Sequence, residues 1–237
     1  MKKKTIKIAH LYYDLMNLYG ESGNVRALKK FIERQDINAE VYSITVGDNI
    51  DFTKYDFYYI GAGTFENFKI VLNDLQNYKT KIKNAIEKNK MFLLTGNAME
   101  LFGKKIRLES GKSLECLGIF NYQSYTVPER ILGNAFYKFD KLPKNRGNQM
   151  IGFLNRNTEM VYTENRMFGF ADNTNYKNFF AMNMIGPVLI RSPYFTNYLI
   201  ERLFEDKGLE YKEIDDTVEF DAYHEFIRIN IKEKNLD

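Results

Sequence analysis

The order of strand-like and helix-like runs is the feature that most constrains the fold of this chain. In the first hundred of its 237 residues, short apolar runs alternate with stretches of helical periodicity. The strand-like runs are residues 5–13, 38–46, 54–63 and 90–96, and the helix-like runs are residues 24–36, 68–88 and 98–104. A β-α-β-α-β order of this kind predicts an α/β fold, with a parallel sheet and helices on both of its faces.

The second half of the chain has a different pattern, in which strands follow one another directly. Its strand-like runs are 116–127, 131–140, 150–162 and 166–172, with turn-like stretches such as 142–148 between them. Residues 178–190, a helix over 194–208 and a helical tail complete the chain. Because no internal repeat or low-complexity linker interrupts it, we expect one mixed α/β domain over residues 1–237, with 205–237 as a C-terminal helical extension.

Composition excludes several classes of protein. The chain is 44% hydrophobic and 15% aromatic, which is enough for a sizeable core and unlike a disordered composition. A net charge of +3 with interspersed lysines and acids does not suggest a nucleic-acid partner. No apolar run approaches the roughly 20 residues of a membrane span, and none follows the basic start as in a signal peptide. We therefore expect a cytoplasmic protein that has no membrane span and binds no nucleic acid.

Cysteine and histidine are scarce, which limits the available chemistry. The chain has one cysteine, Cys116, and two histidines, His10 and His224. An internal disulfide and a Cys-rich zinc site are thereby excluded, and we expect no metal and no cofactor. Cys116 lies beside Leu117 and Ile119 and is predicted to be a buried apolar residue. We expect His10, near the end of the first strand, to make a local hydrogen bond, and His224 to lie at the surface.

Three loops are predicted to meet beyond the carboxyl ends of the parallel strands, where open α/β sheets form their ligand crevice. They are NLYGESGN (17–24), GAGTFEN (61–67) and TGNAMELFG (95–103). Their glycines permit close backbone approach, and exposed N–H groups could form an oxyanion hole or an anion nest. The alternative is that the glycines only make tight turns. The first loop is no phosphate-binding fingerprint, since it lacks the Walker lysine and contains Glu21.

A collinear series of motifs points to a known family. The series is LMNLYGESGNVRALKK, GAGTFEN, LLTGNAMELFG, CLGIFNYQSYTVPERILGN, MIGFLNRNTEMV and MIGPVLIRSPYFTNYLIERL. In this order the motifs resemble the CobB/CobQ-type class I glutamine amidotransferases, most closely those of the GatD type, a subunit of lipid II isoglutaminyl synthase. The resemblance implies a flavodoxin-like class I amidotransferase fold, a mixed, mostly parallel sheet flanked by helices.

The resemblance also implies a reaction and a partner. Proteins of this family hydrolyse glutamine with a Cys–His pair and pass the ammonia to a synthase. For the GatD type, the synthase is a MurT-like protein of the Mur-ligase family, and the two form a heterodimer that amidates lipid II in peptidoglycan synthesis.

The catalytic residues of the family do not carry over to this chain. The position of the nucleophilic cysteine is Gly96, and the position of the catalytic histidine is Ile185. Neither residue can act as nucleophile or base. Arg156 and Phe65 replace other polar positions of the family's motifs. Thr95, one position before the apex, is expected to point away from it. Glycine at the apex would relieve the strain of a sharp strand-to-helix turn, so we expect a chain without catalytic residues.

Several candidate substrate-binding residues remain, namely Arg130, Gly61, Ala62, Gly63 and Asn97. An arginine can hold a carboxylate with two hydrogen bonds, which suggests glutamine or another amino-acid-like ligand. The alternative for this arginine is a surface ion pair with Glu129 or another acid.

Three hypotheses for the function follow. The first is a glutaminase-deficient partner or regulatory subunit of a MurT-like protein, which predicts co-purification with that protein. The second is an active amidotransferase with relocated catalytic residues, which predicts release of ammonia from glutamine. The third is a small-molecule binding module of the same fold, which predicts a ligand in the crevice and neither of the other two properties.

Overall fold

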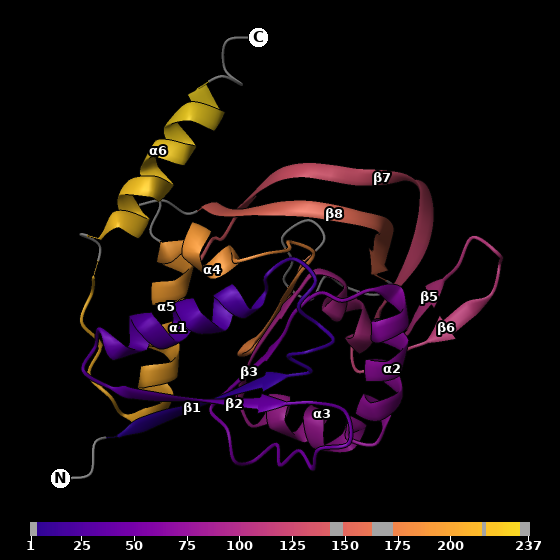
Figure 1. The fold of residues 1–237 in the computed structure, drawn as a ribbon, viewed down its shortest axis with the longest axis horizontal. Coiled ribbons are helices and arrows are strands. Elements are labelled where there is room, and N and C mark those ends of the chain that lie inside the picture. The colour runs from indigo at the N-terminus through magenta and orange to yellow at the C-terminus, as the bar shows by residue number, and fades with distance from the viewer. Residues whose placement is uncertain (1–3, 143–148, 163–172, 215–216, 233–237) are drawn as a thin grey trace.

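The computed structural model describes residues 4–142, 149–162, 173–214 and 217–232, and it contains two sheets (Figure 1). The larger is a six-stranded sheet in the order β2-β1-β3-β4-β10-β9. Five of its strands are parallel, and β9 pairs antiparallel to β10 at one edge. The strands are β1 (Thr5–Leu11), β2 (Asn38–Ile44), β3 (Phe57–Ile60), β4 (Met91–Thr95), β9 (Asn173–Tyr176) and β10 (Phe179–Met182). The predicted mostly parallel sheet is thereby confirmed.

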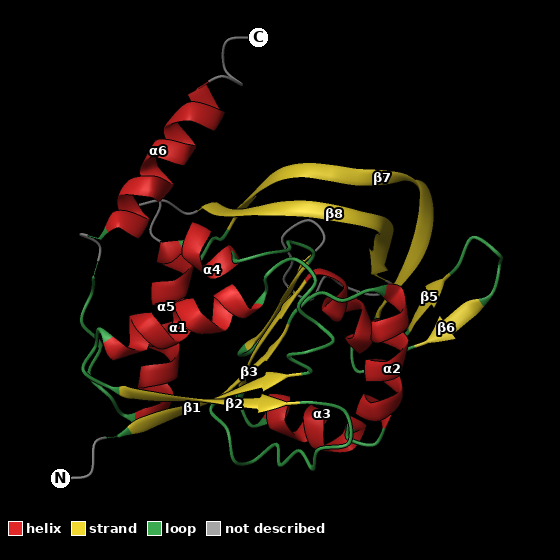
Figure 2. Cartoon of the chain, in the orientation of Figure 1, coloured by secondary structure: helices red, strands yellow, loops and turns green. Residues whose placement is uncertain are grey.

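Helices cover both faces of this sheet (Figure 2). One face packs on α1 (Ser22–Glu33), α4 (Val188–Arg191) and α5 (Pro193–Lys207), and the other on α2 (Phe65–Gln76), α3 (Lys79–Glu87) and the 3₁₀ helix η1 (Gly96–Phe102). Strands β3, β4 and β10 are buried along their whole length. Their sequences are therefore continuous apolar runs rather than alternating ones, as expected for strands covered on both faces.

The smaller sheet contains four strands in the order β6-β5-β7-β8. Its strands are β5 (Lys105–Arg107), β6 (Ser113–Glu115), β7 (Tyr122–Lys138) and β8 (Gln149–Tyr162). Strands β7 and β8 form a long antiparallel ribbon that arches along one side of the molecule (Figure 1). The register shifts between Thr126 and Ile131, and such an irregularity bends a strand and re-aims its side chains.

Several predicted elements differ from the structure. Residues 116–127 and 131–140 were expected to be separate strands, but they contribute to the single strand β7, because the register shift between them bends the strand without ending it. The predicted helix over 68–88 is two helices, α2 and α3. Residues 178–190 contain β10 and α4. The expected strand over 166–172 and most of the turn over 142–148 lie outside the described residues.

The C-terminal helix α6 (Val218–Lys232) packs through Phe220 and Tyr223 against the core that contains α4 and α5. It then runs outward from one corner of the molecule (Figure 1). Among the described helices, none combines the length and the apolar character needed to cross a bilayer. The single-domain boundaries and the cytoplasmic location stay predictions.

Candidate functional site

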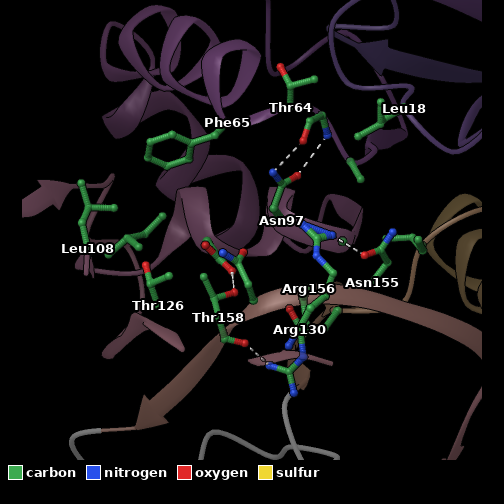
Figure 3. Close-up of a pocket in the computed structure, with 18 of the residues that line it drawn as sticks. Leu18, Thr64, Phe65, Asn97, Leu108, Thr126, Arg130, Asn155, Arg156 and Thr158 are labelled. Atoms are coloured by element: carbon green, nitrogen blue, oxygen red, sulfur yellow. Dashed lines mark hydrogen bonds between the residues drawn. The ribbon is translucent and has the colours of Figure 1, made fainter. Parts of the chain in front are cut away.

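A cavity of about 530 Å³ lies at the carboxyl ends of β3 and β4, where the three predicted loops meet (Figure 3). The loop after β1 contributes Leu18 and Tyr19 to its lining, and the loop after β3 contributes Ala62, Gly63, Thr64 and Phe65. Helix η1 provides Gly96, Asn97 and Glu100, and the β7–β8 ribbon closes the opposite side. The cavity therefore occupies the crevice expected for an open α/β sheet.

One corner of this cavity is closed by apolar atoms. Gly96 follows β4 with φ of +60°, a left-handed backbone conformation that favours glycine, and its N–H donates to the carbonyl of Met184 at 2.8 Å. A Cβ built on Gly96 would lie 2.6 Å from Cβ of Ala62 and 2.9 Å from Cγ2 of Ile185. We call Ala62, Gly96 and Ile185 the closed corner. No side chain fits at Gly96 unless Ala62 and Ile185 move.

Asn97 and Gly63, two of the candidate binding residues, are bonded to each other. The N–H of Gly63 donates to Oδ1 of Asn97 at 3.0 Å, and Nδ2 of Asn97 donates to the carbonyl of Gly63 at 2.8 Å (Figure 3). This pair fastens the loop after β3 to the start of η1. The N–H of Gly63 is therefore already taken and does not serve as an oxyanion-hole donor in this structure.

Gly61 has a packing role behind the cavity and is not among the lining residues. A Cβ at Gly61 would collide with the carbonyl oxygen of Met16 and with the side chain of Glu21. Glu21 is fully buried, and burial raises the pKa of its carboxyl. The N–H groups of Tyr19, at 2.7 Å, and Gly186, at 3.3 Å, donate to its two oxygens. Glu21 thus joins the loop after β1 to the segment before α4.

The β7–β8 side of the cavity is polar and charged. Arg130 is exposed, lies next to the register shift in β7, and donates a hydrogen bond to Oδ1 of Asn155 on β8. Asn155 in turn donates to the hydroxyl of Tyr19 at 3.1 Å. No carboxylate within the described ranges forms a salt bridge with Arg130, so the predicted alternative of an ion pair with Glu129 is not seen. The guanidinium of Arg130 keeps the capacity to bind an anion.

Glu100 is a buried acid of the lining that the motifs did not single out. It is 4% exposed, and its Oε1 accepts a hydrogen bond from the hydroxyl of Thr158 on β8. Burial raises the pKa of Glu100 to about 7, although the Thr158 hydrogen bond and the nearby Arg156 act in the opposite direction. We call Glu100, Arg130, Asn155, Arg156 and Thr158 the charged wall. An acid within the otherwise apolar run AMELF is the sequence signal that could have identified Glu100.

Cys116 and the two histidines do not line the cavity. Burial raises the pKa of the Cys116 thiol to about 12, so the reactive thiolate is scarce near neutral pH. His224 is exposed and hydrogen-bonded to the hydroxyl of Tyr194 at 2.9 Å. The predictions of a buried Cys116 and a surface His224 are confirmed, and these residues form no relocated Cys–His pair at the cavity.

His10 is buried at the end of β1, with its ring against Tyr59. Burial lowers its pKa to about 4, so the imidazole is neutral. The predicted local hydrogen bond is absent at Nε2, which has no partner in the part of the chain that the structure describes. Within the same described part, no group of three acid, cysteine or histidine side chains is placed to hold a metal ion.

Thr95 points away from the cavity, as predicted. Its hydroxyl is hydrogen-bonded to the hydroxyl of Tyr59 at 2.7 Å, and Tyr59 also accepts from Nδ2 of Asn24 at 2.7 Å. Asn24 is fully buried in α1 and bonds to the carbonyl of Gly186 and the N–H of Leu189. A buried polar network therefore lies beneath the apex of the turn.

The fold, with its strand-to-helix turn facing a crevice, is that of a glutamine amidotransferase domain. The sequence matches the CobB/CobQ-like glutamine amidotransferase domain family over residues 7–185, and the chain belongs to that family.

Among curated proteins, the chain is similar to the GatD subunit of lipid II isoglutaminyl synthase (glutamine-hydrolyzing) from two bacteria. Its alignment with the Staphylococcus aureus protein is 244 positions long and 28% identical, and it covers 97% of this chain and 98% of the relative. The chain is 26% identical to the Streptococcus pneumoniae protein over 246 residues, which cover 98% and 91% respectively.

Solved structures share the fold at low sequence identity. A glutamine amidotransferase from Thermotoga maritima is 12% identical with a TM-score of 0.50, over 94% of this chain and 92% of that one. The glutaminase domain of the Trypanosoma brucei CTPS protein with bound acivicin is 11% identical with a TM-score of 0.51, over 87% and 96%. At these identities the likeness concerns the fold alone.

Proposed function

We propose that this chain is a GatD-like subunit without glutaminase activity, which acts as a partner or regulator of a MurT-like Mur-ligase-family protein in the amidation of lipid II. The observation that carries the proposal is the closed corner. At the apex where this family's nucleophile is expected, Gly96 has no side chain, and Ala62 and Ile185 fill the space that a side chain would need.

Glutamine hydrolysis requires a nucleophile and a base, which the described residues of the closed corner do not supply. A thiolate must attack the carboxamide carbon, a base must activate it, and N–H donors must stabilise the oxyanion. Gly96 and Ile185 supply neither nucleophile nor base. The N–H of Gly63 is held by Asn97, and the only thiol of the chain, on Cys116, is buried away from the cavity.

The partnership is supported by the near full-length similarity to two proteins named as subunits of lipid II isoglutaminyl synthase. If the function of the chain is to assemble with a partner and not to hydrolyse glutamine, no side chain is needed at Gly96, and Ala62 and Ile185 can occupy that space.

The experiment is a glutaminase assay on the purified chain, alone and co-expressed with a MurT-like protein, with the Staphylococcus aureus relative as the positive control. We expect no release of glutamate or ammonia from glutamine, and we expect the two co-expressed chains to elute together in size-exclusion chromatography. Cys116→Ser serves as the matched control for alkylation. Glutamine hydrolysis that iodoacetamide abolishes in the wild type, and that Cys116→Ser also lacks, would establish the relocated-nucleophile alternative instead.

A further inference from the structure

The cavity remains open and charged although its catalytic corner is closed. Its lining residues include two arginines, Arg130 and Arg156, and two acids, Glu100 and Glu109, and the guanidinium of Arg156 donates to the carbonyl of Thr158 at 2.8 Å. In a cavity that binds no ligand, we would expect apolar side chains to fill the space, as Ala62 and Ile185 do beside Gly96. These charged groups therefore indicate what kind of molecule the cavity holds.

Glu100 is a buried acid of the cavity lining, and we call its surroundings the inner end. Its side chain lines the cavity, and within the described ranges its one hydrogen bond is the one that Thr158 donates to Oε1, which leaves Oε2 as an unused acceptor. Arg156 lowers the pKa of Glu100, but by less than burial raises it. The buried carboxylate is thus incompletely compensated, and a further positive charge beside it would stabilise it.

The inner end suits an ammonium group better than a carboxamide. An ammonium has three donors and no acceptor, so an unused carboxylate oxygen is a fitting partner. A carboxamide also brings an oxygen that needs a donor, and at the adjacent turn the N–H of Gly63 is engaged by Asn97. At the apex, Ala62 and Ile185 present the apolar atoms Cβ and Cγ2.

Arg130 defines the outer end. It bonds to the amide of Asn155 and forms no salt bridge with a described acid, so its charge is available to a carboxylate. Glu109 is exposed and also lines the cavity, which places a second carboxylate near solvent for an α-ammonium group.

We propose that the cavity binds, without chemical change, an α-amino acid with a cationic side chain, of the lysine or ornithine class, with its side-chain ammonium against Glu100 and its carboxylate against Arg130. This inference rests on the proposed loss of glutaminase activity, because a site that hydrolyses glutamine would bind glutamine as its substrate rather than a cationic amino acid. The ligand would act as an effector of the subunit.

The test is isothermal titration calorimetry of the full chain at pH 8 with L-lysine, L-ornithine, L-glutamine and L-norleucine. Norleucine has the length of lysine but lacks the terminal amine. We expect lysine or ornithine to bind at least tenfold more tightly than glutamine and norleucine. We expect Glu100→Gln to weaken this binding at least tenfold and Arg130→Ala to weaken it severalfold. Glu115→Gln removes an exposed acid outside the cavity lining and is the matched control, so it should leave the affinity unchanged.

Three outcomes would overturn the inference: no binding of either cationic amino acid at millimolar concentration, binding of glutamine as tight as that of lysine, or an unchanged affinity in Glu100→Gln. Circular dichroism of each variant verifies folding, and Arg130→Ala keeps the inference testable if Glu100→Gln does not fold. The glutaminase assay separates the two proposals. Hydrolysis of glutamine contradicts the proposed function, whereas inert glutamine together with unbound lysine contradicts only the ligand.

Discussion

The closed corner and the charged wall lie in one cavity but have opposite chemistry. Around Gly96, a built Cβ would lie 2.6 Å from Cβ of Ala62 and 2.9 Å from Cγ2 of Ile185, so a side chain fits there only if these two residues move. Along β7 and β8 the groups are charged or hydrogen-bonding, and Glu100 and Arg130 retain unused binding capacity. This difference supports the proposal that the apex at Gly96 no longer holds a nucleophile, while the charged wall still offers charged and hydrogen-bonding groups to a ligand.

The largest effect is expected where the closed corner is forced open. Gly96→Ala puts a Cβ against Ala62 and Ile185 at a left-handed φ, which should lower the free energy of unfolding by about 4 kcal/mol through strain and overpacking. Chemical denaturation measures it. Gly111→Ala is the matched control, since Gly111 has φ of +78° with nothing within 4 Å of the added Cβ. Ala62→Gly in the Gly96→Ala background should restore part of the loss. An equal effect at Gly96 and Gly111 would show that the corner is not closed.

A somewhat smaller effect is expected at the charged wall, and it depends on pH. Because the pKa of Glu100 is raised from 4.5 to about 7 in the folded chain, the stability associated with its protonation is present below pH 4.5 and is lost as the pH rises through 7. Glu100→Gln should therefore raise the free energy of unfolding by about 3 kcal/mol at pH 8 and change it little at pH 4.5. Denaturation at both pH values measures this, with Glu115→Gln as the control. Destabilisation at pH 8 would show that the buried charge is already compensated.

Asn97 lies in η1 between Gly96 and Glu100, and its substitution should give an intermediate effect. Asn97→Ala removes both hydrogen bonds to Gly63 and should cost about 2 kcal/mol of folding stability. Asn77→Ala, which loses one exposed hydrogen bond, is the comparison and should cost under about 0.5 kcal/mol. If Asn97→Ala were as mild as Asn77→Ala, the Gly63 N–H would be readily freed, and its exclusion as an oxyanion donor would no longer hold.

The smallest effect on stability is expected at Arg130. Arg130→Ala removes an exposed hydrogen bond to Asn155, so the free energy of unfolding should change by under about 0.5 kcal/mol. The same variant should weaken ligand binding severalfold. A large loss of stability would make Arg130 a structural residue of the ribbon rather than a binding residue of the cavity.

Local patterns were sufficient to predict the parallel sheet. The apolar runs that became β3 and β4 are continuous because both of their faces are buried, and burial on both faces is a property that the sequence of a strand records directly. Gly96 and Ile185 were identified by their places in collinear motifs. In the structure the two residues are neighbours, because a Cβ built on Gly96 would lie 2.9 Å from Cγ2 of Ile185.

What the sequence did not reveal depends on contacts between distant segments. Asn97 and Gly63, both expected to bind a ligand, bond to each other across 34 positions of the chain. Glu100 becomes a cavity residue only because Thr158, 58 positions away, lies opposite it. The two strands expected over 116–140 contribute to the one strand β7 because β8 pairs with the ribbon on both sides of the register shift. Of these residues, only Glu100 has a local signal, as an acid within the otherwise apolar run AMELF.

The network of Asn24, Tyr59 and Thr95 has a consequence for the motions of the molecule. It joins α1, β3, the end of β4 and the segment before α4, and its members are fully buried. Local separation of these segments would break several buried hydrogen bonds at once. We therefore expect the segments to separate only when the whole chain unfolds. The amide hydrogen of Leu189, held by Asn24, should accordingly exchange with solvent at the rate of global unfolding.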